Sequence, residues 1–489
     1  MSREPSSPGP RRSGLERIAR DAMVAHGLEP DFPPDARAQL AHLAPAGDSA
    51  RRDLRALPWS SIDNDDSRDL DQLEVCVERP DAAPRVLVAI ADVDVLVAKD
   101  SPLDRHAALN TTSVYTPAIV FPMLPPELST DRTSLNQDED RAAMVVDMTI
   151  DEAGAVVASE IYRARVRNKA QLTYNAIAAW LDGSGPAPAA FARVPGLEAQ
   201  VRLQETVAGR LRERRVDEGA LDFARSELRP VIEGDGVKEL RTETTNRAKS
   251  IIENFMVATN GVTARFLTER GFATIRRVVQ SPERWPRIVD LASQHGGSLP
   301  GAPDARALQQ FLKTRREAEP DTFQDLSLAV IKLLGRGEYV AESAAEPSGH
   351  FALATGTYSH STAPNRRFPD VVTQRLLKAA IDKRSTPYAL PDLRRLAEHC
   401  TKQEDAANKV ERLTAKAAAA LWLTPQIGKT FDSVVTGAGP KGTWVRLVPT
   451  PVEGRLERGA QGLDVGDRVR VRLVSTDPQR GFIDFERAT

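Results

Sequence analysis

Acidic side chains are concentrated in one short segment, SIDNDDSRDLDQLEV. Five carboxylates fall within nine residues, at Asp63, Asp65, Asp66, Asp69 and Asp71. Carboxylates this close repel one another, and the apolar residues between them indicate that the segment packs into the fold instead of forming a solvated loop. Carboxylate oxygens select hard cations such as Mg²⁺, Mn²⁺ or Ca²⁺. The segment therefore predicts a divalent metal site.

Two kinds of metal site fit this spacing. Counted as a calcium loop from its first aspartate, the segment offers oxygen ligands at the later ligand positions: Asp65, Ser67, Asp69, Asp71 and Glu74. Against a calcium loop, Arg68 stands where the sharp turn needs glycine, and a strand-like run follows where a helix is required. In the catalytic alternative, Asp63, Asp69 and Asp71 hold two ions that act on a phosphodiester. That site also needs a cationic group elsewhere in the chain.

A cationic segment lies roughly 300 residues downstream, within SGHFALATGTYSHSTAPNRRFPDVVTQRLLKAAI. Arg366 and Arg367 directly precede a predicted helix, and a planar guanidinium suits a phosphate that gains charge in the transition state. The alternative role of Arg366 is an ordinary salt bridge at a helix start. His350 and His360 flank the pair but have no third ligand nearby in sequence, which disfavours zinc.

Together, SIDNDDSRDLDQ and the arginine segment resemble the signature pair of the ribonuclease II and ribonuclease R family, whose catalytic domain is the RNB domain. The resemblance covers roughly residues 30–489 and includes YTPAIVFPMLPPELSTDRTSLN, QLTYNAIAAWL and NRAKSIIENFMVATN. It implies a processive hydrolytic 3′-to-5′ exoribonuclease that degrades single-stranded RNA to 5′-monophosphates. It also implies Mg²⁺ as the cofactor, with Mn²⁺ as an alternative, and a mixed α/β catalytic domain followed by an OB-fold.

The resemblance assigns the metal-binding and catalytic roles. Asp63, Asp69 and Asp71 match the metal ligands of the family, and Arg366 matches its catalytic arginine. Where the family commonly has a further aspartate, this sequence has Gln72, whose carbonyl can coordinate a metal but brings no charge. An RNA-binding protein with an impaired metal site is therefore an alternative function, and a calcium-binding module is a second.

The resemblance also assigns residues that contact RNA. Tyr115 and Phe223 match aromatic residues that clamp the terminal bases, and a π-face does this without sequence preference. Tyr174 and Glu253 match positions that recognise the ribose, where a hydroxyl and a carboxylate can engage the 2′-hydroxyl group. Arg367 is expected to contact RNA beside the catalytic arginine.

Hydrophobic patterns indicate the elements that position these residues, and the fold class is α+β multidomain. The β-branched runs between residues 58 and 168 predict a mixed sheet. Helices are expected over 197–215, 245–270, 368–384 and 391–423. On the second helix, Asn246, Ser250, Glu253 and Asn260 form a polar stripe that faces either a cavity or solvent.

Three domains are expected. Residues 1–50 form a flexible tail and a small helical element that could resemble a helix-turn-helix, 51–424 form the RNB-type catalytic domain, and 425–489 form an OB-fold that binds RNA. About 60 residues precede the carboxylate motif, which predicts a short form without the two cold-shock barrels usual in the family. In RVRVRLV, strand alternation puts Arg468, Arg470 and Arg472 on one face of a strand. This face could bind the RNA backbone, or it could be the solvated face of a barrel strand.

Composition narrows the classes of protein. The 489 residues carry 66 Lys and Arg against 68 Asp and Glu, so the protein has almost no net charge. A polyanion would therefore have to bind local basic patches on its surface. Cys76 and Cys400 are the only cysteines, which excludes a disulfide framework and fits a reducing cytoplasm. No apolar run approaches the length of a membrane span. We expect a cytoplasmic monomer without a membrane partner.

Overall fold

The computed structural model describes residues 10–44, 52–79, 81–224, 226–233, 236–320, 322–343, 349–440, 442–448 and 450–488. Its largest unit is a seven-stranded mixed sheet with the strand order β1-β8-β7-β4-β3-β2-β9. The strands are β1 (Arg52–Asp53), β2 (Ser60–Asp63), β3 (Gln72–Arg79), β4 (Ala82–Ala91), β7 (Asp140–Ile150), β8 (Val156–Arg167) and β9 (Ala170–Thr173). The mixed sheet predicted from the β-branched runs is confirmed.

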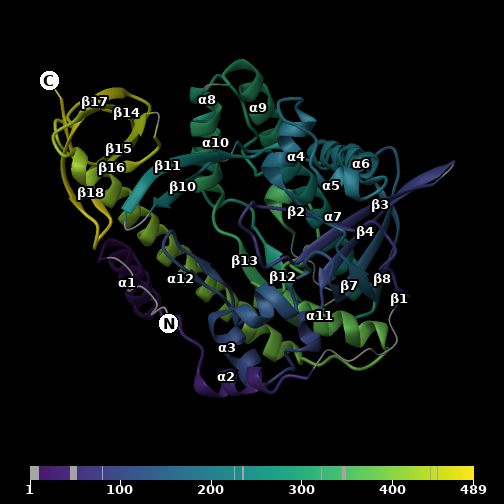
Figure 1. The fold of residues 1–489 in the computed structure, drawn as a ribbon. Coiled ribbons are helices and arrows are strands. Elements are labelled where there is room, and N and C mark those ends of the chain that lie inside the picture. The colour runs from purple at the N-terminus through teal and green to yellow at the C-terminus, as the bar shows by residue number, and fades with distance from the viewer. Residues whose placement is uncertain are drawn as a thin grey trace.

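The central strands of this sheet are antiparallel, and the outer pairs β1–β8 and β2–β9 are parallel. Helix α7 (Arg247–Glu269) packs against β2, β7 and β8, and it buries Ile251, Ile252 and Phe255 there. Helix α6 (Leu197–Asp217) packs against α7 and β3 (Figure 1). Helix α11 (Phe368–Ile381) also contacts α7. The shorter helices are η1 (Val93–Val95), α3 (Pro102–Asn110), α4 (Tyr174–Leu181) and α5 (Ala190–Arg193).

Several elements between the predicted helices have no counterpart among the sequence expectations. Strands β10 (Ser226–Glu233) and β11 (Gly236–Thr244) form an antiparallel hairpin, and β12 (Thr274–Val278) pairs with β13 (Glu338–Glu342). Helices α8 (Trp285–Gln294), α9 (Ala305–Ala318) and α10 (Phe323–Leu334) share a small hydrophobic core of their own. The remaining short elements are β5 (Val114–Tyr115), β6 (Val120–Phe121), the π-helical turn η2 (Glu127–Arg132), and η3 (Phe351–Leu353).

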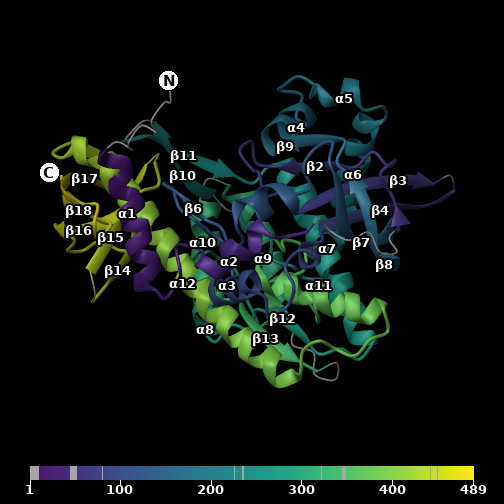
Figure 2. The same ribbon diagram turned by 60° about the horizontal axis from the view of Figure 1, so that its bottom comes forward.

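The longest helix, α12 (Leu390–Leu423), runs from the catalytic sheet region to the C-terminal barrel (Figures 1 and 2). The barrel is closed in the order β14-β15-β16-β18-β17 and follows the short η4 (Thr424–Gln426). Its strands are β14 (Thr430–Gly439), β15 (Gly442–Val448), β16 (Glu453–Arg458), β17 (Arg468–Asp477) and β18 (Phe482–Arg487). A closed five-stranded barrel confirms the predicted OB-fold.

At the N-terminal end, α1 (Pro10–Ala25) lies along α12, and α2 (Pro34–Ala41) packs against α3. Ala19 and Met23 of α1 share a buried cluster with Ala406 and Val410 of α12. Residues 1–9 of the predicted tail lie outside the described residues. Among the described residues, no helix is long and apolar enough to cross a membrane.

Candidate metal and RNA-binding site

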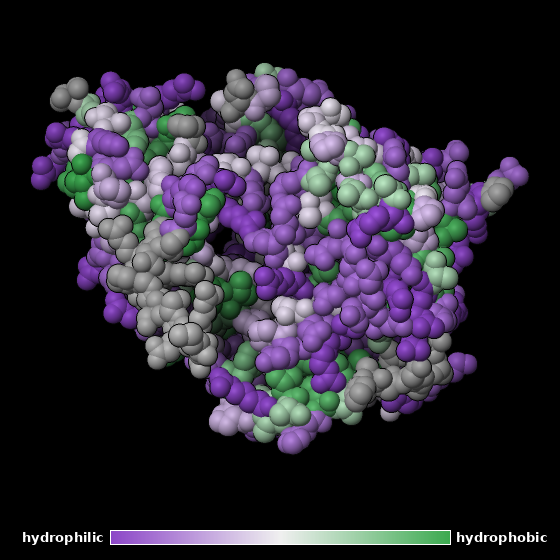
Figure 3. Space-filling model, viewed as in Figure 1, coloured by the Kyte–Doolittle hydropathy of each residue, from purple (hydrophilic) through white to green (hydrophobic). Residues whose placement is uncertain are grey.

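One large cavity of about 2490 Å³ lies between the sheet, the β10–β11 hairpin and α12. Its lining includes the loop from Asn64 to Asp69, the cavity-facing side chains of α6 and α7, and Arg412 of α12. Figure 3 shows this face hollowed between the barrel side and the sheet side, with hydrophilic side chains around the hollow. Basic groups contributed by separate elements, such as Arg68, Arg212, Arg229 and Arg277, make the cavity suitable for a polyanion.

The two sequence motifs meet at Asp71. Its side chain is 3% exposed, and Oδ1 accepts a hydrogen bond of 2.9 Å from the backbone N–H of Asn365. Its Oδ2 lies 3.5 Å from Nε of Arg366, whose side chain remains 45% exposed. Burial raises the pKa of Asp71 to about 8, and the positive charge of Arg366 offsets part of that rise. The structure therefore joins the carboxylate and arginine segments.

Asp63 and Asp69 lie near this meeting point. Asp63 ends β2, and its Oδ1 accepts hydrogen bonds from Asn64 N (2.7 Å) and Ser67 Oγ (2.9 Å). Burial raises the pKa of Asp63, and the charge of Asp69 adds to the pKa rise of both Asp63 and Asp71. The three carboxylates are therefore electrostatic neighbours with the hard oxygen donors that a divalent cation prefers.

These donors are not drawn together around a common point. Across the described part of the chain, no three His, Cys, Asp or Glu side chains are close enough to one another to hold a metal ion as they stand. Mutual repulsion between the carboxylates opposes a closer approach, because the charge of Arg366 offsets only part of theirs. The donor chemistry fits a hard divalent cation, and binding one would require Asp63, Asp69 and Asp71 to move closer.

The other two aspartates of the segment point to different partners. Asp65 Oδ2 accepts a hydrogen bond of 2.5 Å from Asn175 Nδ2, and Asp66 forms an ion pair with Arg229 of β10. Strand β3 follows the segment directly, so the helix that a calcium loop would need is replaced by a strand. The structure thus separates Asp65 and Asp66 from the Asp63, Asp69 and Asp71 group and disfavours the calcium-loop alternative.

Gln72 is the first residue of β3 and is 9% exposed. It follows Asp71 directly and pairs in register with Ile90 of β4. Its position places it next to the carboxylate group, and metal ligation by its carbonyl oxygen stays a prediction.

The arginine pair divides into an exposed member and a half-buried one. The side chain of Arg366 is 45% exposed beside Asp71, and its carbonyl accepts hydrogen bonds from Ser113 N (3.0 Å) and Thr112 Oγ1 (3.2 Å). Arg367 donates a hydrogen bond of 2.8 Å from Nη2 to Oδ1 of Asp370, which is fully buried. Burial lowers the pKa of Arg367, but the negative charge of Asp370 and neighbouring groups outweighs burial, so the pKa is raised overall. Arg367 therefore has a structural partner already, and its expected contact with RNA stays a prediction.

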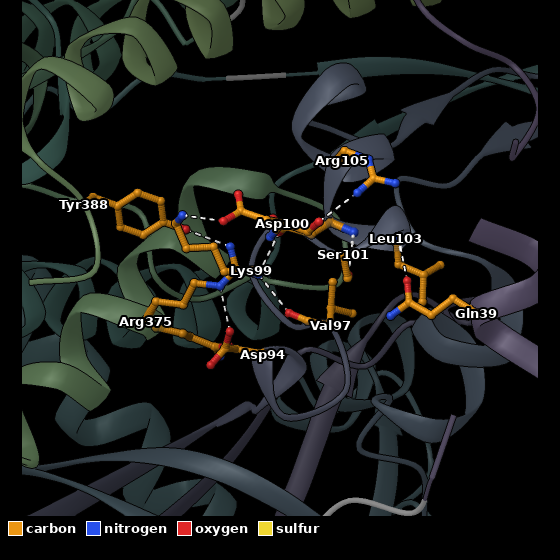
Figure 4. Close-up of polar contacts among 12 residues, drawn as sticks. Gln39, Asp94, Val97, Lys99, Asp100, Ser101, Leu103, Arg105, Arg375 and Tyr388 are labelled. Atoms are coloured by element: carbon orange, nitrogen blue, oxygen red, sulfur yellow. Dashed lines mark hydrogen bonds and ion pairs between the residues drawn. The ribbon is translucent and has the colours of Figure 1, made fainter. Parts of the chain in front are cut away.

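A buried ion network fixes the helix that follows this pair. Arg375 of α11 pairs with Asp94 at 2.6 Å and with Asp104 at 2.7 Å, and it donates a hydrogen bond of 2.7 Å to Tyr388 Oη. Figure 4 shows Arg375 lying between Asp94 and Tyr388. Lys378, one turn later, pairs with Asp94 at 2.9 Å. Because both partners of each pair are largely buried, this network anchors α11 and with it the arginine segment.

The four residues expected to contact RNA bases and ribose all line the cavity: Tyr115, Tyr174, Phe223 and Glu253. Tyr115 is 42% exposed, and its hydroxyl donates a hydrogen bond of 2.8 Å to Asp69 Oδ2. Phe223 packs one side against the α8–α10 core and presents the other to the cavity. The sequence prediction thus selected residues that the fold brings into one cavity from distant segments.

The polar stripe of α7 faces the cavity only in part. Asn246 caps the helix by accepting a hydrogen bond of 2.9 Å from Lys249 N, and Asn246, Ser250 and Glu253 line the cavity. Asn260 is instead buried, where it donates to Tyr358 Oη at 3.0 Å and accepts from Ser361 N at 2.8 Å.

Several cavity-lining residues were not predicted. Arg229 comes from the unpredicted hairpin, and Arg212 and Arg215 come from the RERR run of α6. The only sequence signal for the latter two is that charge run, which is equally typical of a solvated helix face. His350 and His360 also line the cavity, and burial lowers the pKa of both, so they are neutral there.

The barrel arginines lie outside this cavity lining. Arg468, Arg470 and Arg472 occupy the exposed positions of β17, which alternate with the buried Val469 and Val471. Arg472 forms an ion pair with Glu486, and Arg470 lies 3.6 Å from Asp432. The predicted one-sided arrangement is present, and its role as an RNA track stays a prediction.

Comparison with known protein families supports the resemblance inferred from the carboxylate and arginine segments. Residues 51–383 match the RNB domain, and residues 429–488 match the RNase II-type exonuclease C-terminal S1 domain. Ribonuclease R of Aquifex aeolicus is 28% identical over 463 residues, which are 89% of this chain and 64% of that protein. The chain thus spans just under two thirds of this relative's length.

Solved structures share the fold. Mycoplasma genitalium RNase R, in complex with ribose methylated single-stranded RNA, gives a TM-score of 0.86 at 20% identity and covers 97% of this chain and 78% of its own. Yeast Ssd1, a pseudonuclease, gives a TM-score of 0.71 at 16% identity and covers 91% of this chain and 56% of its own. The family resemblance inferred from the two motifs is confirmed by the match of the RNB domain over most of the chain. The chain therefore belongs to the RNB domain family and carries an RNase II-type C-terminal S1 domain.

Proposed function

We propose that this protein is a metal-dependent, processive 3′-to-5′ exoribonuclease that hydrolyses single-stranded RNA to 5′-monophosphates. The observation that carries the proposal is the meeting of buried Asp71 with the Asn365–Arg366 segment at the carboxylate group. Its relatives named Ribonuclease R support the same activity. Mg²⁺ is the proposed cofactor, because hard carboxylate oxygens are the available donors, and Mn²⁺ is the alternative.

The chemistry follows from the arrangement. Asp63, Asp69 and Asp71 would hold the metal, with Gln72 offering a neutral oxygen beside them. When bound, divalent ions activate a water molecule and stabilise the leaving oxygen of a phosphodiester. The exposed guanidinium of Arg366 can bind the scissile phosphate, whose negative charge grows in the transition state. Binding of that phosphate by Arg366 would also draw the guanidinium away from Asp71 and leave its oxygens for the metal.

The cavity supplies the binding surface for the RNA strand. Tyr115 and Phe223 would stack on terminal bases, and Tyr174 and Glu253 would contact the ribose 2′-hydroxyl group. Basic groups around the opening would neutralise phosphates. Both cysteines are free and buried, which supports the expected reducing cytoplasm as the site of action.

The test is to incubate the full-length protein with 5′-labelled poly(A) in the presence of Mg²⁺ or EDTA. The proposed enzyme produces a ladder of shortened 5′-labelled fragments with Mg²⁺ and none with EDTA. Intact RNA under both conditions, together with a shift in a binding assay, would instead support an RNA-binding protein with an impaired metal site.

Two observations support the alternative of an RNA-binding protein with an impaired metal site. Gln72 removes one negative charge from the expected metal shell, and the fold also occurs in yeast Ssd1, a pseudonuclease. Replacing Gln72 with aspartate distinguishes the two, because a dead site that lacks only this charge would gain metal-dependent activity.

A further inference from the structure

Three hydrogen-bond donors line the cavity near Glu253 and have no role in the metal, base or ribose assignments. They are the guanidinium of Arg215 in α6, the imidazole of His350 and the phenol of Tyr358. Each keeps at least one N–H or O–H group without an acceptor among the described residues. We call these three residues the donor cluster.

Packing of two distant segments brings the donor cluster together. Just after α6, Leu221 donates a backbone hydrogen bond of 2.9 Å to the carbonyl of Ala352, in the segment that carries the other two donors. The rings of His350 and Tyr358 lie edge to face, with their centroids 5.7 Å apart. Burial lowers the pKa of Arg215 and raises that of Tyr358, and the charge of each group opposes the shift of the other. The three side chains are therefore neighbours on one wall of the cavity.

A hydrogen bond from the backbone determines where the proton of His350 lies. Leu353 N donates to Nδ1 of His350 at 3.2 Å, so Nδ1 carries a lone pair and no proton. The ring proton is therefore on Nε2, which has no partner in the described part of the chain. Burial lowers the pKa of His350 to about 4, which agrees with a neutral ring. His350 thus offers an N–H donor to the cavity that it lines.

Asn260 determines how the hydroxyl of Tyr358 is used. Oδ1 of Asn260 accepts a hydrogen bond of 2.8 Å from Ser361 N, so its Nδ2 is the donor to Tyr358 Oη at 3.0 Å. The phenol oxygen therefore already acts as an acceptor. Its proton has no acceptor among the residues that the structure describes, and Tyr358 is a donor toward the cavity.

Arg215 is the cation of the donor cluster. Its Nη2 donates to Asn254 Oδ1 at 2.5 Å, and its Nε is buried without a partner in the described residues. Arg212, one turn earlier in α6, pairs with Asp222, whereas Arg215 forms no ion pair within the described part of the chain. Glu253 and Asp222 act on the pKa of Arg215 only through their charge. A guanidinium with unused N–H groups suits a phosphate, which can accept two parallel hydrogen bonds.

We propose that Arg215, His350 and Tyr358 form a subsite for a phosphate monoester, next to the position proposed for the last ribose. An ionised phosphate accepts hydrogen bonds and carries negative charge, which matches three donors of which one is a cation. The inference rests on the proposed function, because it takes the cavity as the surface that holds the 3′ end of RNA.

The neighbourhood of the donor cluster indicates which phosphate it would bind. Glu253 is proposed to contact the 2′-hydroxyl group of the last ribose, and the next residue, Asn254, holds Arg215. A phosphate on the 3′ oxygen of that ribose would lie next to the same contact. The expected occupant is therefore the 3′-phosphate of an RNA chain, and a released nucleoside 5′-monophosphate is the other source of the same chemistry.

The test compares two short 5′-fluorescein-labelled adenylate oligomers that differ only at the end, a 3′-hydroxyl or a 3′-phosphate. Their affinities for the full-length protein are measured by fluorescence anisotropy in EDTA. We expect the wild type to bind the 3′-phosphate oligomer about tenfold more tightly, and Arg215→Gln to lose this preference. Tyr358→Phe keeps the ring and should reduce the preference about threefold. Each preference is a ratio within one protein, so a general loss of RNA affinity does not change it.

Arg212→Gln is the matched control, because it removes a guanidinium from the same helix that is already paired with Asp222. We expect it to affect both oligomers alike and to keep the wild-type ratio. Competition against the labelled 3′-hydroxyl oligomer tests the other source: adenosine 5′-monophosphate should then compete better than adenosine, and Arg215→Gln should abolish that advantage. No phosphate advantage in either assay, or a full advantage in Arg215→Gln, would overturn the inference.

The wild-type protein shows which proposal has failed. If it degrades poly(A) with Mg²⁺ but shows no phosphate advantage in either assay, the subsite inference alone is wrong. If it shows a phosphate advantage that depends on Arg215 but produces no ladder, the subsite stands and the proposed hydrolytic function is wrong.

Discussion

The hydroxyl of Tyr115 donates a hydrogen bond of 2.8 Å to Oδ2 of Asp69. Tyr115 is a proposed base clamp, whereas Asp69 is a proposed metal ligand. One side chain therefore links the surface expected to hold the RNA base to the group expected to hold the metal. Base stacking on the Tyr115 ring and placement of Asp69 can be tested separately, because they use different parts of the same residue.

Two substitutions of Tyr115 separate these roles. Tyr115→Phe keeps the ring but loses the hydrogen bond, so we expect near wild-type RNA affinity and a higher Mg²⁺ concentration for half-maximal activity. Tyr115→Ala also removes the stacking surface, which is worth about 1–3 kcal/mol per base, or roughly 5- to 100-fold in affinity. Fluorescence anisotropy with a short RNA and a Mg²⁺ titration of the rate measure the two effects. Equal RNA affinity in both variants would contradict the base-clamp assignment.

The buried carboxylate of Asp71 predicts a pH dependence of stability in the metal-free protein. Its pKa rises from 3.8 to about 8 on folding, so the folded state binds the proton more tightly than the unfolded state does. This contribution to stability is fully present below about pH 4 and is lost as pH rises toward 8. We expect the advantage of the wild type over Asp71→Asn to shrink, or to reverse, across this range. Melting temperatures of both proteins in EDTA measure it, and a constant difference would contradict the burial argument.

The sugar assignment rests on two residues that line the cavity, Tyr174 and Glu253. We expect the double variant Tyr174→Ala and Glu253→Ala to narrow the preference for RNA over DNA, because both groups can engage the 2′-hydroxyl group. Competition binding between RNA and DNA oligomers of one sequence measures this preference. Ser250→Ala, at a cavity-lining position with no assigned sugar contact, is the control. Unchanged discrimination in the double variant would reject the assignment.

The barrel is expected to serve long substrates. Removing residues 425–489 should lower affinity for long RNA more than for oligomers of a few nucleotides, because the barrel arginines lie outside the cavity lining. The salt dependence of long-RNA binding should also become shallower as fewer phosphates are neutralised. Replacing Arg468, Arg470 and Arg472 together with serine tests the same surface without a truncation. Equal losses for short and long RNA would mean that the barrel supports the fold instead.

The parts of the fold that the sequence predicted have strong periodicity. The β-branched runs around Val88 and Val145 predict buried strands, because β-branched residues favour extended backbone. The alternation of Arg470 with Val471 predicts a strand with one exposed and one buried face. Helices α8–α10 and the β10–β11 hairpin were not predicted. The helices bury residues such as Phe323 in a small core of their own, and Leu240 of the hairpin is buried against α12 and the barrel, which are distant in sequence.

The meeting of the two proposed catalytic segments follows from long, contiguous motifs, and the structure brings Asp71 of one beside Arg366 of the other. The directions of individual side chains were not predictable from the sequence. Asp65 and Asp66 share the loop with the proposed ligands, yet Asn175 and Arg229 hold them elsewhere, and both partners come from segments more than a hundred residues away. Arg367 adjoins the exposed Arg366, but its pairing with Asp370 depends on the turn into α11. Such pairings arise from tertiary packing and leave no local pattern.

The central claim is that Asp71 joins the carboxylate and arginine segments into one metal-dependent catalytic site. Its most direct test is the rate at which wild-type and Asp71→Asn proteins degrade 5′-labelled poly(A) in Mg²⁺, measured together with their affinity for the same RNA. We predict a metal-dependent ladder from the wild type, a loss of rate on the order of 10²- to 10³-fold in Asp71→Asn, and retained RNA binding in both. Degradation by Asp71→Asn at the wild-type rate would contradict the claim.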